Sequence, residues 1–309
     1  MMERKTFAVT GATGNIGSVL TETLLSRGHQ VRAIGRSRER LQPLVEKGAD
    51  ALVGSLDDTE FLSRSFTGAD AVFGMIPPNL TASDFRAYQN QIGEALATAI
   101  KNAGVKQVVN LSSIAGHLDE GTGPIKGLHD NEERFNALED VNVVHLRPGF
   151  FMENLLFGVE VIKNMGANGS ALDPQVALPM IATRDIALVA ADLLTGSFSG
   201  KSVREILGQR DLTMTEATTA IGNAIGKPDL KYVQFPYEDA RKAMLGMGMS
   251  QNMVDEMIEM YRGMNSGIVR PSEARSPENT TPTTIGEFAR STFAAAYGAN
   301  KAQSAARTA

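Results

Sequence analysis

The feature that most constrains the fold is a glycine-rich segment near the N-terminus. Gly11, Gly14 and Gly17 follow the apolar run Thr6–Val9, and Ile16–Ser26 has helical spacing. Glycines between a strand and a helix let the backbone approach a pyrophosphate, and the helix N-terminus offers N–H groups and a partial positive charge. A tight turn with no ligand would show the same glycines, so the elements that follow decide between the two interpretations.

Apolar runs typical of buried strands alternate with segments of helical spacing through the first half of the chain. The runs are Gln30–Ile34, Ala51–Val53, Ala71–Ile76, Gln107–Leu111 and Val141–Leu146, and the helical segments are Arg40–Lys47, Thr59–Phe66, Asp84–Ala103 and Asn131–Leu138. This alternation predicts an α/β chain with the Rossmann fold, in which a doubly wound parallel sheet binds a nucleotide at its carboxyl edge.

The chain is expected to divide into three parts. Residues 1–150 would form the NAD(P)-binding Rossmann domain, and residues 151–297 a smaller C-terminal α/β cap that completes the fold and binds the substrate. Residues 298–309, rich in alanine and polar residues, are expected to form a flexible tail.

Composition narrows the classes of partner. The 309 residues carry a net charge of −5, which argues against a nucleic-acid partner. No apolar run approaches the ~20 residues that cross a membrane, and the first strand begins too early to leave room for a signal peptide. We therefore expect a cytoplasmic protein with a small-molecule partner.

Metal and disulfide chemistry are not expected. The sequence has no cysteine and only four histidines. His29 and His145 are expected to be structural, and His117, with Asp119 and Glu120 nearby, is too weak a pattern to predict a metal site.

The residues after the second strand distinguish NADP from NAD. An NAD site usually carries an acidic residue here, but Ile34 is followed by Gly35 and Arg36. A guanidinium paired with the 2′-phosphate would contribute about 1.5–3 kcal/mol and favour NADP(H) roughly ten- to a hundredfold. The alternative is a solvated basic run, in which Arg38 and Arg40 face water.

Several further motifs lie where strands are expected to end. With Val9–Gly17, they are Arg36, Met75–Pro78, Val109–Ser113 and His145–Asn154. Together they resemble the NmrA-like atypical short-chain dehydrogenases, a group that includes triphenylmethane-dye reductases, NADPH:quinone oxidoreductases and catalytically silent redox-sensing regulators. The resemblance covers the first half of the chain closely and the remainder in outline.

The proton-donating pair of ordinary short-chain dehydrogenases, Tyr-x-x-x-Lys, is missing from its usual helix. Only Tyr297 and Lys301 match its spacing, and they lie too near the C-terminus to count. The resemblance implies a His-x-x-x-Glu pattern instead, met by His129 and Glu133. Histidine can donate a proton near neutral pH. The alternative is an exposed His129 ahead of a helix that Asp130 and Glu133 cap.

The strand ends supply the remaining candidates. Ser112 either faces the nicotinamide or simply ends its strand. Pro77 either lies against the cofactor or only terminates the strand before it. Phe150 lies either in a pocket wall or in the core. His129 and Ser112 are the catalytic candidates. The expected NADP(H) contacts are Gly11, Thr13, Gly14, Asn15, Ile16, Gly17, Arg36, Ile76, Pro77, Ser112, Pro148 and Phe150.

A methionine-rich segment in the second half bears on the substrate. Seven of the fourteen methionines lie between Met244 and Met264, and the last four occupy one helix face. Such a face packs on the core or adapts to apolar ligands as a mobile lid, and Gly246, Gly248 and Gly263 favour the lid.

These observations predict an NADPH-dependent oxidoreductase that transfers hydride to a quinone-like or conjugated electrophilic molecule, apolar or aromatic in character. The alternative is a redox sensor that binds NADP(H) without turnover and changes its affinity for a protein partner. A ketone reductase with unrecognised proton donors is a third possibility, and a homodimer is a further expectation.

Overall fold

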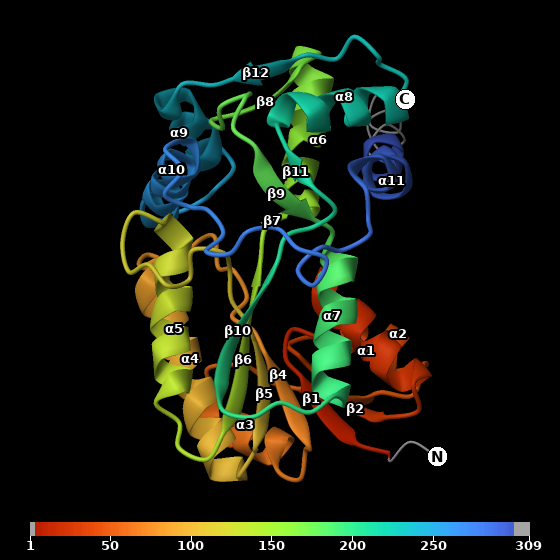
Figure 1. The fold of residues 1–309 in the computed structure, drawn as a ribbon, viewed down its shortest axis with the longest axis vertical. Helices are drawn as coiled ribbons and strands as arrows, with labels where there is room; N and C mark the ends of the chain where they lie inside the picture. The colour runs from red at the N-terminus through yellow and green to blue at the C-terminus, as the bar shows by residue number, and fades with distance from the viewer. Residues whose placement is uncertain (1–3, 300–309) are drawn as a thin grey trace.

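A seven-stranded parallel sheet forms the centre of the computed structural model, which describes residues 4–299 (Figure 1). The strand order is β10-β6-β5-β4-β1-β2-β3, so the winding direction reverses between β1 and β4. The predicted α/β class and doubly wound sheet are confirmed. The strands are β1 (Thr6–Val9), β2 (Gln30–Gly35), β3 (Asp50–Val53), β4 (Ala71–Gly74), β5 (Gln107–Leu111), β6 (Asn142–Pro148) and β10 (Lys201–Ile206).

Helices cover both faces of the sheet because alternate strand residues are apolar on both sides. Phe7 and Val9 of β1 pack into one buried cluster, while Ala8 packs into another. The first cluster includes residues of α1 (Asn15–Ser26), α2 (Arg38–Val45) and α7 (Thr183–Thr195), and the second includes residues of α3 (Thr59–Phe66), α4 (Phe85–Ala103) and α5 (Lys126–Asn136).

The remaining elements lie mainly beyond the carboxyl edge of the sheet, in the upper half of Figure 1. Two small sheets, β11-β9-β7 and β12-β8, form here around a separate buried cluster. The elements are β7 (Phe150–Phe151), η2 (Met152–Phe157), α6 (Gly158–Met165), β8 (Asn168–Ser170), β9 (Leu178–Ile181), β11 (Asp211–Leu212), α8 (Met214–Ala224), β12 (Tyr232–Gln234), α9 (Tyr237–Gly246), α10 (Gln251–Asn265), α11 (Ile285–Phe288) and a π-helical turn at Ala289–Phe293.

The central sheet is not confined to residues 1–150. The later strand β10 pairs in parallel with β6, with Glu205 opposite Arg147, and α7 packs beside α1. The chain therefore passes into the upper elements after β6 and returns to complete the sheet.

Helix α5 begins earlier than the sequence pattern predicts. It continues directly from the 3₁₀ turn η1 (Gly123–Ile125), so Asp130 and Glu133 lie inside the helix and the predicted capping box is wrong. Asp130 instead accepts two 2.7 Å hydrogen bonds from Arg86 on α4, which lower the pKa of its carboxyl. His129 is accordingly a helical residue, not one that precedes the helix.

The methionine-rich helix α10 is packed against its neighbours. Met253 and Met264 are buried, and a Cβ on Gly263 would lie 2.5 Å from the carbonyl oxygen of Gly121. Lys126 of α5 also pairs with Glu256 and with Glu259 of α10, at 3.1 and 2.7 Å. Gly263 thus permits close packing, which favours the core interpretation of this face over the lid.

Both chain ends extend past the described residues. Lys301 and most of the predicted tail lie outside residues 4–299, while Tyr297 is buried in the upper cluster. Within the described range, no helix combines the length and apolar character needed to span a bilayer.

Candidate functional site

The turn between β1 and α1 has the shape that a pyrophosphate requires. Gly11 has a φ of +61°, and a Cβ on Gly17 would lie 2.2 Å from the carbonyl oxygen of Gly11. The N-cap residue of α1 is the exposed Gly14, and no side chain between residues 4 and 299 caps this helix. The first N–H groups of α1 are therefore presented toward a ligand, and the turn fits a dinucleotide.

The predicted contacts around this turn differ in accessibility. Thr13 and Asn15 are partly or fully exposed, whereas the side chain of Ile16 is buried in the core. Sequence reasoning missed the buried Thr10. Its hydroxyl donates to the Phe73 carbonyl at 3.0 Å and accepts from the Met75 amide at 2.9 Å. Thr10 thereby places the loop with Ile76 and Pro77 beside the glycine turn.

The basic segment after β2 lies beside the same turn. Arg36 directly follows β2, is exposed, and forms no ion pair or hydrogen bond to any residue in the described range. Burial raises the pKa of the nearby Tyr88 phenol, and the positive charge of Arg36 partly opposes this rise. Arg40, which the alternative interpretation left facing water, is exposed and donates to the Thr13 carbonyl at 3.3 Å. Arg36 thus has a guanidinium available for a 2′-phosphate.

Gly17→Ala is expected to destabilise the fold by about 1–3 kcal/mol, because the added methyl group overlaps the backbone of Gly11. Urea unfolding would measure the loss. Gly246→Ala is the matched control, since a Cβ there meets no atom within 4 Å and its φ is not positive. Equal stability of the two variants would contradict the close approach in the turn.

A buried polar network lies at the ends of β5 and β6. Ser112 donates to Glu132 on α5, and Arg147 of β6 donates to both Glu132 oxygens at 2.9 and 2.5 Å. The exposed fractions of Ser112, Glu132 and Arg147 are only 3%, 3% and 7%. Burial alone would lower the pKa of Arg147, but the hydrogen bonds and charge of Glu132 raise it. Arg147 therefore keeps its positive charge inside the protein.

The network extends to the edge of the sheet. Glu205 of β10 is buried opposite Arg147 and accepts hydrogen bonds from the backbone N–H groups of Ser272 and Glu273, each at 3.0 Å. These bonds hold the segment 270–273 across the carboxyl ends of β6 and β10. A buried carboxylate paired in this way is satisfied without a ligand.

Ser112, Pro148 and Phe150 come together where β5 and β6 end. The loop after β5 is tied to β6 by bonds from the Ser112 amide to the Leu146 carbonyl and from the Ile114 amide to the Pro148 carbonyl, at 2.8 and 3.0 Å. Phe150 is half-buried in β7. Because the Ser112 hydroxyl hydrogen is directed to Glu132, a catalytic role for Ser112 would use its oxygen as an acceptor. That role stays a prediction.

His129 lies close to this network on the first turns of α5. Its Nδ1 lies 3.1 Å from the Gly116 carbonyl oxygen, which can only accept, so Nδ1 carries a proton and Nε2 is left for other chemistry. A Cβ on Gly116 would lie 2.8 Å from the Ser112 hydroxyl oxygen. His129 and Ser112 therefore lie on two sides of one short loop. Glu133 is exposed, and Glu132 is the buried acid that sequence reasoning missed.

The other histidines have structural partners. His145 accepts from Asn110 at Nδ1 and donates from Nε2 to Asn136, both at 3.0 Å, and burial lowers its pKa. The expectation of a satisfied core histidine is confirmed. His117 lies 3.2 Å from the Ser272 hydroxyl. In the part of the chain that the structure describes, no three acidic or histidine side chains form a group that could hold a metal.

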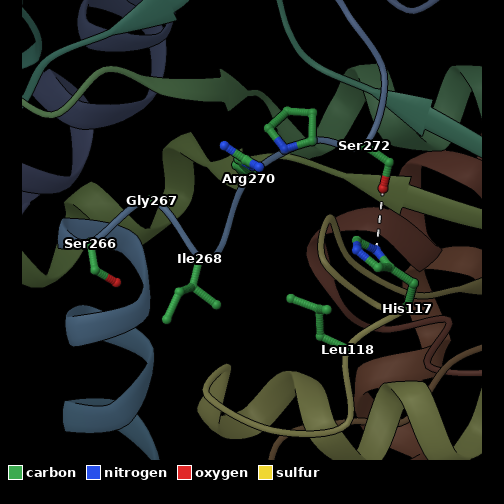
Figure 2. Close-up of a pocket in the computed structure, with 8 residues that line it drawn as sticks. His117, Leu118, Ser266, Gly267, Ile268, Arg270 and Ser272 are labelled. Carbon is green, nitrogen blue, oxygen red and sulfur yellow. Dashed lines mark hydrogen bonds between the residues drawn. The ribbon is translucent and has the colours of Figure 1, made fainter.

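Two cavities lie near these residues. The smaller, about 360 Å³, opens beside His129 between α5 and the exposed edge strand β10. The larger, about 520 Å³, lies between the loop after β5 and the segment 266–272 (Figure 2). His117 lines both. The larger cavity is formed by the loop after β5 and by the segment that Glu205 of β10 anchors, whereas the reversal of strand order, where such sheets bind nucleotides, lies between β1 and β4.

Comparisons with known proteins agree with this architecture. The NmrA-like family model matches residues 3–289. An NAD(P)H azoreductase from Xenophilus azovorans is 30% identical over 298 residues, which cover 94% of this chain and 99% of the azoreductase.

Two solved structures share the fold. The NADPH-dependent quinone oxidoreductase from Escherichia coli, complexed with NADPH, superposes with a TM-score of 0.77 at 20% identity, covering 93% of this chain and 99% of that one. The triphenylmethane reductase from Citrobacter sp., complexed with NADP(H), has a TM-score of 0.75 at 19% identity, covering 92% and 99%. The resemblance read from the motifs is confirmed: the chain belongs to the NmrA-like family.

Proposed function

We propose that this chain is an NADPH-dependent oxidoreductase that reduces a quinone-like or conjugated electrophilic small molecule. The observation that carries the proposal is a complete dinucleotide turn combined with a helix α5 that contains no tyrosine. A fold that binds the cofactor but lacks the phenol donor is suited to acceptors that disperse negative charge after hydride transfer, because these need no strong acid.

The residues of the chain have separate tasks in this proposal. The glycine turn and Arg36 would hold the phosphates of NADPH, which supplies a hydride from its nicotinamide when bound. Ser112, Pro148 and Phe150 would position the acceptor end of the site, where β5 and β6 end. Because its Nδ1–H is bound to the Gly116 carbonyl, His129 would return a proton to the reduced acceptor from Nε2 as an imidazolium and would regain that proton from solvent.

The named relatives support this class of substrate. The azoreductase, the quinone oxidoreductase and the triphenylmethane reductase are all named for reducing conjugated or aromatic compounds. The 520 Å³ cavity at the carboxyl edge has the size of a small-molecule site, which favours a reductase.

A sensor that binds NADP(H) without turnover is the second candidate. One observation favours it: the hydroxyl hydrogen of Ser112 is committed to Glu132, so the strand end offers no second proton donor beside His129. Such a protein would bind NADPH and change its affinity for a protein partner instead of reducing a substrate.

The two candidates are separated by measuring NADPH oxidation with quinones, triphenylmethane dyes and simple ketones, alongside NADPH binding. We expect turnover with quinones or dyes and little with ketones. Tight NADPH binding without turnover on any acceptor would contradict the reductase and favour the sensor. The cytoplasmic location and the homodimer stay predictions, and sedimentation equilibrium tests the second.

His129→Ala is expected to lower kcat roughly a hundredfold at neutral pH, because it removes the proposed proton donor. The KM for NADPH should change little, since His129 lies outside the glycine turn. Glu133→Ala on the same helix is the control, because its side chain is exposed and holds no loop contact. Unchanged turnover in His129→Ala would remove this histidine from the mechanism.

A further inference from the structure

The larger cavity combines apolar walls with a single cationic side chain. Leu118 and Ile268 lie on opposite sides of it in Figure 2, and Arg270 lies in the upper part of the same view. Ile268 is about half exposed and therefore offers apolar surface to a ligand in the cavity. Aliphatic walls facing each other suit a planar aromatic ring.

Arg270 is an exposed cation at the cavity. It forms no ion pair or hydrogen bond with any residue between 4 and 299, whereas most arginines of the chain do. Asp119 and Glu273 directly follow the lining residues Leu118 and Ser272 in the sequence, but neither acid lines the cavity. Arg270 is therefore the charged side chain of this lining, with no acidic residue beside it in the cavity wall.

The backbone on each side of Arg270 is anchored. Before it, the buried Val269 donates its N–H to the Gly263 carbonyl at 3.0 Å. After it, the Ser272 N–H binds the buried Glu205 carboxylate at 3.0 Å. Two anchors within three residues hold Arg270 at the cavity, so little backbone ordering would be required when a ligand binds.

We propose that Arg270 makes this cavity a subsite for the anionic substituent of an aromatic acceptor, such as a sulfonate or a carboxylate. The proposal rests on the proposed reductase function and adds a charge preference to it. The planar guanidinium pairs with two oxygens of such a group, and the Ser272 hydroxyl beside His117 offers a further polar contact. By the same charge, a cationic triphenylmethane dye should be turned over with a higher KM than an anionic acceptor of similar size.

The test uses two acceptors that share one ring system and differ in charge, 1,4-naphthoquinone and its 2-sulfonate. For Arg270→Gln we expect KM for the sulfonate to rise about tenfold, and KM for the neutral quinone to change less than twofold. Arg270→Lys keeps the charge and should fall between the wild type and Arg270→Gln. Arg270→Glu should lower KM for a cationic dye. Arg64→Gln, on α3 with a side chain 68% exposed, is the control and should change none of these values.

Binding without turnover separates this proposal from the reductase function. Calorimetric titration of the naphthoquinone sulfonate into the wild type and Arg270→Gln, each saturated with NADP⁺, should show about tenfold weaker binding to the variant. This difference is expected even if no acceptor is reduced. Equal dissociation constants, or equal KM changes for the neutral and anionic quinones, would overturn the subsite.

Discussion

Glu132→Ala should destabilise the protein by about 3–5 kcal/mol, because it leaves the Arg147 guanidinium buried without its carboxylate. The same change removes the acceptor of the Ser112 hydroxyl hydrogen and opens space beside Gly116. Urea unfolding at neutral pH, followed by circular dichroism, would measure the loss. Because single domains have total stabilities of about 5–15 kcal/mol, this variant would be close to the limit of folding.

The neighbouring residue supplies the control for this prediction. Glu133→Ala removes an exposed carboxylate from the same helix turn and should change stability by less than about 0.5 kcal/mol. The double variant Glu132→Leu with Arg147→Met removes both charges and should recover part of the loss. If the Glu132→Ala and Glu133→Ala proteins had equal free energies of unfolding, the buried Glu132–Arg147 pair would not contribute to stability.

Arg36→Glu should weaken NADPH binding about a hundredfold, equivalent to about 2.8 kcal/mol. The substitution removes the guanidinium at the end of β2 and places a carboxylate where the 2′-phosphate would lie. NADH lacks that phosphate, so its affinity should change by no more than about threefold. Fluorescence titration of the two reduced cofactors measures both affinities in one experiment.

Arg38→Glu is the matched control for Arg36→Glu. Arg38 is also exposed, carries the same charge and begins α2 two residues later, but it does not directly follow the strand. We expect it to change both cofactor affinities slightly and equally. Equal losses of NADPH and NADH in Arg36→Glu would contradict the assignment of Arg36 to the phosphate.

Much of the cofactor end was readable from the sequence because its determinants are local. The turn requires residues without a side chain at Gly11 and Gly17. The adjoining strand and helix follow from the spacing of apolar residues along the sequence. These properties involve residues close together in the chain, so no long-range contact is needed to recognise them. The predicted α3 (Thr59–Phe66) and β5 (Gln107–Leu111) coincide with the observed elements for the same reason.

The residues at the proposed catalytic end meet through packing between distant segments. The family resemblance implied Glu133 as the partner of His129, but α5 presents Glu132 to Arg147 and leaves Glu133 exposed. The start of α5 was missed because the helix continues from a 3₁₀ turn and needs no capping side chain. Which face of a helix is buried depends on the sheet that it meets.

The sequence by itself determined the Rossmann architecture, the dinucleotide turn and Arg36 after β2, since each is a pattern along consecutive residues. Only the tertiary structure decided that β10 completes the sheet and that Gly263 packs against Gly121. It alone also placed Arg270 beside a cavity formed with Leu118. These features join residues far apart in the chain, and such pairs meet only when the whole core is packed.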